Sequence, residues 1–188
     1  MNPQQTSAQP IVTESTPNPN TLKFNVHRVL LDSGSADFPT KESAQRSPLA
    51  AKLFGIVGVG GVFIGRDFVT ITKSASVDWQ VVVPAATQAI QQHLVGGEAI
   101  VAGAEAGASA ASASDVEQKI REIIDREVRP AVAMDGGDII FVGFQGGIVK
   151  LHLQGSCHGC PSSLMTLKMG IENRLRRAVP EVVAVEAV

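Results

Sequence analysis

Residue types that often reveal a protein's chemistry are scarce in this sequence. Its 188 residues include two cysteines, one tryptophan and no tyrosine. With so few aromatic side chains, the chain lacks the platforms on which single-stranded nucleic acids stack. Its 16 lysines and arginines against 18 acidic residues give a net charge of −2, so no strong positive field attracts nucleic acid or an anionic membrane. We therefore expect neither partner.

Targeting and membrane-spanning segments are also missing from the pattern. Residues 1–20 contain no lysine, no arginine and no apolar block, which argues against a secretory signal and against an arginine-rich transit peptide. No apolar run is long enough to span a bilayer. We expect a cytoplasmic protein. In that reducing setting, two cysteines three positions apart indicate metal binding or catalysis more than a structural disulfide.

The first half of the chain has the pattern of a small α+β domain over residues 11–98, after a disordered tail at residues 1–10. Apolar alternation and glycine, proline and serine signals predict a strand at 21–26, a helix at 47–56 capped by Ser47 with Pro48 in its first turn, a hairpin at 60–73, and a helix from Pro84 to about Val95 that ends at Gly96 and Gly97.

Residues 99–114 are almost entirely alanine, glycine and serine. Side chains this small cannot bury enough surface to offset the entropy cost of ordering the chain. An alanine-rich helix is the alternative, but Gly103 and Gly107 disfavour it. We interpret the segment as a flexible linker.

The second half, residues 115–188, predicts a second small α+β domain. Ser114 and Glu117 have the spacing of a capping box that starts a helix, and Pro130 should limit that helix. The following pattern predicts strands at 138–144 and 147–155, a helix from Pro161 with an apolar stripe at Leu164, Leu167, Ile171 and Leu175, and a β-rich end at 181–188. The expected order is helix, strand, strand, helix, strand, with the cysteines in a C-x-x-C loop before the last helix.

Cys157 and Cys160 lie between a predicted strand and the N-terminus of a predicted helix. Unpaired N–H groups and the helix dipole stabilise negative charge there, so we expect both thiols to have lowered pKa values.

Four interpretations of this loop remain open on the residues alone. The two thiols are incidental, or they form a thioredoxin-like redox pair, although that motif normally follows the first strand of a βαβ unit and this one follows a hairpin. They bind zinc, with His158 as a poorly placed third ligand. Or they hold half of an iron-sulfur cluster, which usually takes four thiolates, so that two chains share one cluster across a two-fold axis.

The run MDGGDIIFVGFQGGIVKLHLQGSCHGCPSSLMTLKMGIENRLR resembles the C-terminal domain of the NifU/Nfu iron-sulfur cluster carriers, and TPNPNTLKF with GVGGVFIGRDFVTITK and Trp79 is similar to the N-terminal domain that accompanies it. The resemblance implies a homodimer that binds a 4Fe-4S cluster through Cys157 and Cys160, or also a 2Fe-2S form. It implies transfer of the cluster to apo-protein clients after supply by upstream assembly machinery. It implies a carrier, not an enzyme. The missing transit peptide suggests a bacterial cytoplasmic member.

Other polar candidates receive structural interpretations. Asp135 and Asp138 of the M-D-G-G-D run are too few for a metal site, and Gly136 and Gly137 indicate a turn that shapes the cysteine loop. His27, His93 and His152 are expected to be exposed or half-buried, and His158 is expected to face solvent. A thiol-disulfide oxidoreductase that uses the same two cysteines is the alternative function.

Overall fold

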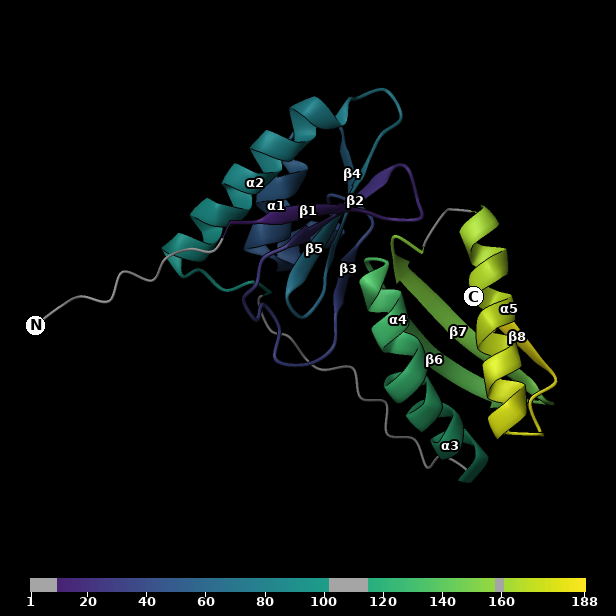
Figure 1. Cartoon of the computed structure of the whole chain (residues 1–188). Coiled ribbons are helices and arrows are strands. Elements are labelled where there is room, and N and C mark those ends of the chain that lie inside the picture. Colours follow the sequence, from purple (N-terminus) through teal and green to yellow (C-terminus); the bar gives the residue numbers. More distant parts are fainter. Residues whose placement is uncertain (1–9, 102–114, 158–160) are drawn as a thin grey trace, which may run out of the picture.

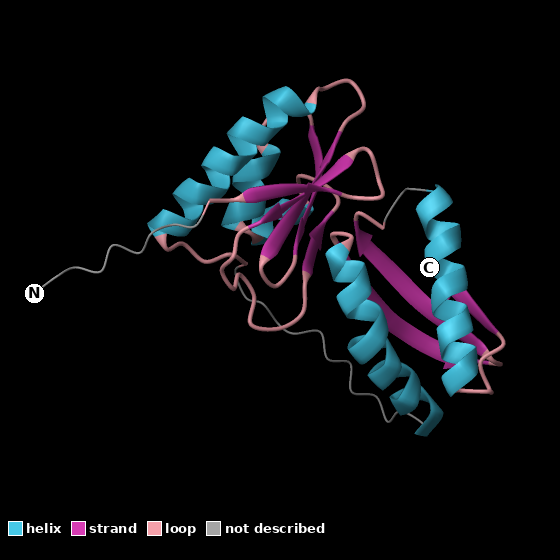
Figure 2. Cartoon of the chain, viewed as in Figure 1, coloured by secondary structure: helices cyan, strands magenta, loops and turns pink. Residues whose placement is uncertain are grey.

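The structure is a computed structural model that describes residues 10–101, 115–157 and 161–188. Most of the predicted linker and the predicted N-terminal tail fall outside these residues, as do His158 and Cys160 of the C-x-x-C motif. Figure 1 shows two α+β units, each built around its own sheet, and Figure 2 shows the two sheets in magenta. The fold class predicted from the sequence is confirmed.

The first unit contains a five-stranded antiparallel sheet in the order β1-β2-β5-β4-β3. Its elements are β1 (Val12–Ser15), β2 (Thr21–Asn25), β3 (Ala36–Phe38), the 3-10 helix η1 (Ser43–Arg46), α1 (Pro48–Phe54), β4 (Val59–Ile64), β5 (Phe68–Lys73) and α2 (Trp79–Gly96). The predicted strand, hairpin and first helix are confirmed, and β1, β3 and η1 are additions.

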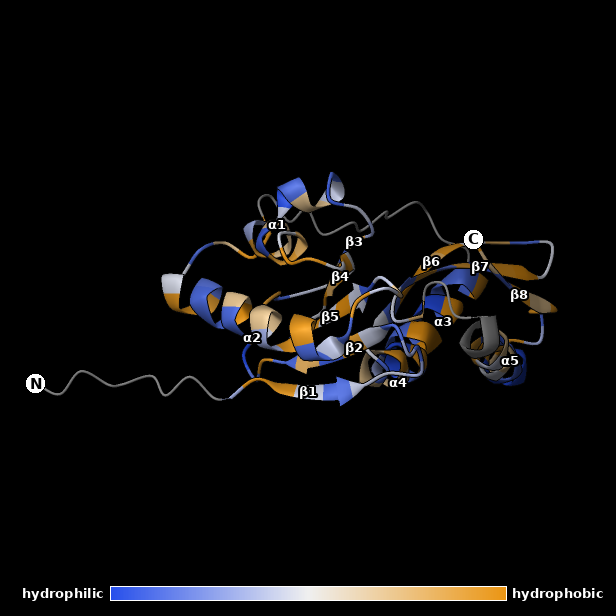
Figure 3. Ribbon diagram, turned by 90° about the horizontal axis from the view of Figure 1, so that it is seen from above, coloured by the Kyte–Doolittle hydropathy of each residue, from blue (hydrophilic) through white to orange (hydrophobic). Residues whose placement is uncertain are grey.

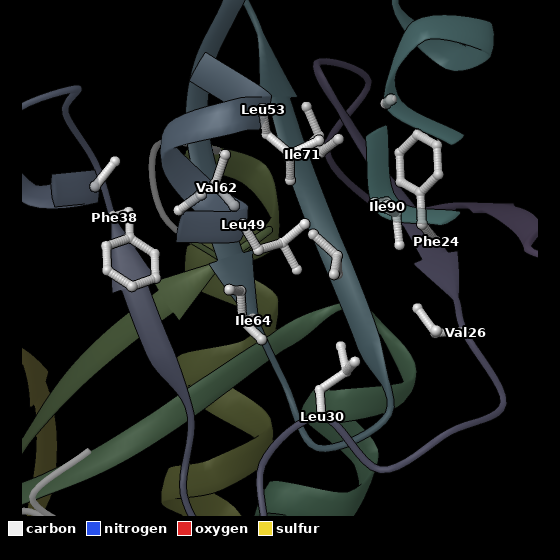
Figure 4. Close-up of a cluster of buried hydrophobic side chains, with 14 of the residues drawn as sticks. Phe24, Val26, Leu30, Phe38, Leu49, Leu53, Val62, Ile64, Ile71 and Ile90 are labelled. Carbon is white, nitrogen blue, oxygen red and sulfur yellow. The ribbon is translucent and has the colours of Figure 1, made fainter. Parts of the chain in front are cut away.

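Alternation in the strands decides which sheet face α1 and α2 cover. Phe24, Val62 and Ile71 point to the helices and are at most 2% exposed. Figure 4 shows Leu49 and Leu53 of α1 beside Val62 and Ile71, and Phe24 beside Ile90 of α2. Burying each such side chain stabilises the fold by roughly 1.5–3 kcal/mol. Ser47 caps α1 as predicted, because its hydroxyl accepts a hydrogen bond from the Ala50 N–H at 3.0 Å.

The start of α2 differs from the prediction. The helix begins at Trp79, where the Asp78 carboxylate accepts a hydrogen bond from the Gln80 N–H at 2.9 Å, and Pro84 lies inside it. The helix therefore starts at a capped N-terminus five residues before the proline. The stabilisation from this cap exceeds the cost of the proline, whose missing N–H leaves only the Gln80 carbonyl without its helical partner. The predicted glycine stop is confirmed, since Gly97 follows the helix with φ +66°. Figure 3 shows polar and apolar residues alternating along α2.

The second unit contains a three-stranded sheet, β6 (Gly137–Gln145), β7 (Ile148–Gly155) and β8 (Ala184–Ala187), with β7 paired antiparallel to β6 and parallel to β8. Its helices are α3 (Asp115–Ile123), the π-helix η2 (Ile124–Val128), α4 (Arg129–Met134) and α5 (Pro161–Ala178). They pack on the sheet around a second apolar core that includes Ile120, Ile139, Leu151 and Leu175.

Pro130 does not end the first helix of this unit, contrary to the prediction. The π-turn precedes it, with the Arg129 N–H bonded to the Ile124 carbonyl, and Pro130 then falls in the first turn of α4. A proline is tolerated in a first turn because its missing N–H has no intrahelical partner there.

The first and second apolar cores are separate clusters. Ile100 and Val101 pack on the first core, and Val116 packs on the second. The boundaries drawn from the sequence at residues 10, 98 and 114 stay a prediction.

Candidate functional site: the cysteine loop

Cys157 lies two residues after β7 ends at Gly155, and α5 begins at Pro161. The cysteine is 5% exposed and belongs to the second apolar core. Because β7, α5 and β8 form a parallel crossover, the loop occupies the strand-to-helix junction of a βαβ unit. The motif follows the β6–β7 hairpin as the sequence predicted, but β7 is also the first strand of this βαβ unit, so the hairpin does not argue against a redox site.

The pKa expected for the Cys157 thiol is wrong. Burial raises that pKa to about 11 and outweighs the hydrogen bond with the Ser156 hydroxyl, which lowers it, while the nearby carboxylates of Asp135 and Asp138 raise it further. Cys157 precedes the helix N-terminus by four positions and lies in an apolar core, so loss of water outweighs the helix dipole. A nucleophilic redox cysteine needs a lowered pKa, which disfavours Cys157 in that role.

The M-D-G-G-D run makes the turn that packs against Cys157. A Cβ atom at Gly137 would lie 2.8 Å from the Cys157 Sγ and 2.7 Å from the Gln154 carbonyl oxygen, too close for any side chain. Gly136 has φ +80°, which favours glycine. The structural interpretation of the two glycines is confirmed, since Gly136 takes the positive φ and Gly137, the first residue of β6, makes the close contact, while their part in shaping the cysteine loop stays a prediction.

Ser156 fastens the loop to this turn. Its hydroxyl donates to the Asp135 carbonyl at 2.5 Å, and its N–H donates to the Gly136 carbonyl at 3.2 Å. Sequence reasoning missed this residue, although its position directly before Cys157 was a usable signal.

Asp138 is 6% exposed and acts as a structural ion-pair partner. The Arg129 guanidinium donates two hydrogen bonds to its carboxylate, at 2.8 and 2.7 Å, and Ser35 and the Ile139 N–H donate one each. Burial alone would raise the pKa of Asp138, but these donors outweigh burial and hold the pKa below its ordinary value. The same pair raises the pKa of Arg129. Removing one partner of such a pair typically costs about 3–5 kcal/mol.

A groove of about 580 Å³ opens beside Cys157, between α4 and α5. Most of its lining residues are apolar or small: Val128, Ala131, Val132, Leu167, Gly170 and Ile171. Glu127 and Arg174 also line the groove, and their side chains form an ion pair at 3.6 Å. Pro17 of the first unit also contributes to the wall.

The remaining candidates lie apart from this loop. Within the described residues, no group of three or more histidine, cysteine, aspartate and glutamate side chains could hold a metal ion. His93 is 1% exposed, not half-buried as expected, because it faces the segment after α2. Cys160 and His158 lie outside the described residues, so their predicted roles stay predictions. No helix in the described part of the chain is long and apolar enough to cross a membrane.

Two α+β units with one C-x-x-C at a strand-to-helix junction define the class of Nfu-type proteins. Residues 11–97 match the family described as "Scaffold protein Nfu/NifU N terminal", and residues 120–186 match the NifU-like domain. The chain belongs to this Nfu/NifU family.

Several curated proteins are similar over most of the chain. The human "NFU1 iron-sulfur cluster scaffold homolog, mitochondrial" is 46% identical over 181 residues, which cover 95% of this chain and 71% of the relative. "NifU-like protein 4, mitochondrial" of Arabidopsis thaliana is 45% identical over 183 residues, 94% of this chain and 65% of the relative. A solution NMR structure of a NifU-like protein from Saccharomyces cerevisiae aligns with a TM-score of 0.45 at 31% identity, over 50% of this chain and 84% of that one.

Proposed function

We propose that this protein is an iron-sulfur cluster carrier that binds a 4Fe-4S cluster between the C-x-x-C motifs of two subunits and transfers it to apo-proteins. The observation that carries the proposal is the position of Cys157, the first cysteine of the chain's single C-x-x-C, two residues after β7 and packed against the glycine turn that precedes β6. One chain supplies two thiolates, whereas such clusters usually need four. Two copies related by a two-fold axis supply all four, from Cys157 and Cys160 of each.

The environment of Cys157 fits cargo that is bound and later released. Iron binds the thiolate, so cluster binding must displace the thiol proton that burial stabilises. A thiol that burial holds in its protonated form is a weaker iron ligand, which suits a carrier more than a permanent cofactor site. The cluster is the cargo of the protein, and no catalytic step is proposed.

The names of the similar proteins support the same role, since the human relative is named an iron-sulfur cluster scaffold. Apo iron-sulfur proteins as clients, upstream assembly machinery as donors, a 2Fe-2S form and a bacterial cytoplasmic location belong to this proposal. The human and Arabidopsis relatives are named as mitochondrial proteins, so the location needs its own test, by fractionation of the source cells.

Anaerobic reconstitution with iron and sulfide, with mass measured on the same sample, tests the proposal. We expect a dimer with about four irons and four sulfides per two chains. The Cys157→Ser and Cys160→Ser variants should each lose the cluster and the cluster-dependent dimer. His158→Ala is the matched control from the same loop, and it should retain both.

A second measurement separates the alternative functions. A colourless monomer that reduces disulfides would overturn the carrier proposal in favour of an oxidoreductase. One tightly bound zinc ion per chain that depends on His158 would overturn it in favour of a zinc site.

A further inference from the structure

A row of side chains crosses the first sheet on the face opposite its helices. Lys23 on β2 is paired in register with Thr70 on β5, and Thr70 with Phe63 on β4. These side chains point away from the first core, yet Lys23 is 9% exposed, Thr70 1% and Phe63 2%. Their burial comes from the second unit, because β4 and β5 both contact β7. Figure 1 shows the end of α4 and the tip of β7 beside this sheet.

Lys23 and Thr70 bind the backbone of the turn that shapes the cysteine loop. The Lys23 ammonium donates to the carbonyls of Ala133 and Met134, at 3.0 and 3.3 Å, which are the last carbonyls of α4. A cation at this end of a helix complements the dipole and adds a donor to its last carbonyls, and the Ala133 carbonyl also accepts from the Gly136 N–H at 3.1 Å. The Thr70 hydroxyl donates to the Gly136 carbonyl at 2.7 Å.

The Gly136 carbonyl connects the two units to Cys157. It accepts from the Thr70 hydroxyl and also from the N–H of Ser156, the residue before Cys157. Any movement of this carbonyl therefore moves Ser156 as well.

Three smaller contacts surround this connection. The Asn18 amide donates to the Ser156 carbonyl at 3.5 Å, and the Ser35 hydroxyl donates to Asp138 at 2.5 Å. Phe63 packs so closely on Gly155 that a Cβ atom there would lie 3.0 Å from the ring. The contacts extend from the end of α4 to the residue before Cys157.

We propose that the first unit is a clamp on the cysteine loop, in which Lys23 and Thr70 are positioning residues that hold the glycine turn against Ser156 and Cys157 and thereby slow the entry and departure of the cluster. The statement about the turn stands on the contacts alone, and the statement about the cluster rests on the proposed function. With the clamp released, the carbonyls of Ala133, Met134 and Gly136 lose the donors that the first unit supplies, and Cys157 is held less tightly.

The full-length apo-protein tests the clamp without any cluster. The variants are Lys23→Met, which keeps the length of the side chain, and Thr70→Val, which keeps its shape. Lys41→Met, an exposed lysine of the same unit, and Thr72→Val, two residues further along β5, are the matched controls.

Two readouts distinguish a positioning role from a general loss of stability. Hydrogen exchange of the Gly136 and Ser156 amides should accelerate by about tenfold in Lys23→Met, as loss of a hydrogen bond to a charged donor predicts, and by about threefold or more in Thr70→Val, where the lost donor is neutral. Alkylation of Cys157, measured by mass spectrometry relative to Cys160 in the same molecule, should rise in parallel. Exchange in α1 should stay unchanged, as should all readouts in the controls.

Unchanged exchange at Gly136 and Ser156 in both folded clamp variants would overturn the clamp. If Lys23→Met does not fold, Thr70→Val alone decides the question. In reconstituted protein, the clamp variants should release iron to a chelator several-fold faster than the controls. If no protein, wild type included, takes up a cluster, the proposed function is overturned, and the clamp is then judged from the apo-protein results alone. If the clamp variants and the controls release iron at equal rates, the effect of the clamp on the cluster is overturned.

Discussion

Single residues hold the cysteine loop in place. The sequence predicted the role of some of these residues and missed the role of others. The structural role of the two glycines could be predicted because glycine is conformationally special, whereas the roles of the two cysteines, singled out because cysteine is scarce here, stay predictions. The pKa of Cys157 could not be predicted, because proximity to a helix N-terminus can be seen in the sequence, whereas burial in an apolar core is a tertiary property. The same limit applies to His93, whose sequence neighbours did not indicate its burial.

The buried His93 predicts a pH dependence of stability. The residue is 1% exposed, and Nδ1 lies 3.4 Å from the Glu98 carboxylate. Burial lowers the pKa of His93, Lys52 lowers it further, and Glu98 opposes them only in part. Below pH 6.5, the ordinary pKa of histidine, the unfolded chain binds a proton that the folded His93 does not. The free energy of unfolding therefore decreases as the pH falls from 6.5 through the lowered pKa of His93.

Denaturant unfolding of wild type and His93→Leu at a series of pH values checks this prediction. The leucine variant lacks the titrating group. Its free energy of unfolding should therefore rise relative to that of the wild type as the pH falls below about 6.5. Parallel curves over the whole range would contradict it.

At the scale of helices and strands, local signals were sufficient wherever they agreed with one another. Alternation predicted β2 and the β4–β5 hairpin, and the Ser47 cap with Pro48 predicted α1. The three-residue strand β3 was missed because so short a segment carries almost no period. Pro84 and Pro130 were taken as helix boundaries, but Asp78 in one case and a π-turn in the other allow the helical path to pass through them.

The interior proline of α2 predicts a stabilising substitution. Pro84 is solvent-exposed, so Pro84→Ala loses little packing and gives the Gln80 carbonyl an N–H partner. We expect a gain of about 1 kcal/mol or more in the free energy of unfolding, after allowance for the greater freedom of the unfolded chain. Urea unfolding measures it.

Pro48→Ala provides the control for this substitution. Pro48 lies in the first turn of α1, where proline fits without losing a hydrogen bond, so the change should be neutral or slightly destabilising. Equal effects at the two sites would show that helix position is not the cause.

At the scale of the whole molecule, the sequence predicted two units but not their contact. In the structure, Lys23 and Thr70 point away from the first core, to a face where a lysine and a threonine would ordinarily meet solvent. Both instead bind the backbone of a turn more than 60 residues away in the sequence, and side-chain patterns carry no information about backbone carbonyls.

This contact predicts that the two units unfold together. The single tryptophan, Trp79, reports on the first unit, and far-UV circular dichroism reports on both. We expect coincident thermal transitions for the two probes in the apo-protein, because unfolding either unit removes the buried contacts of the other. In Lys23→Met the transitions should separate. A two-step circular dichroism curve in the wild type, with fluorescence following only one step, would contradict this prediction.

The carbonyls that Lys23 and Thr70 bind also bear on how such chains can be recombined. A chimaera that joins the first unit of one Nfu-type protein to the second unit of another keeps both apolar cores intact, since each core closes within its own unit. Under the proposed clamp, the first unit holds the cysteine loop of the chimaera only if its strands carry hydrogen-bond donors at the positions of Lys23 and Thr70. Each unit therefore has its own apolar core, but the side chains of the first unit and the turn of the second must be compatible with each other.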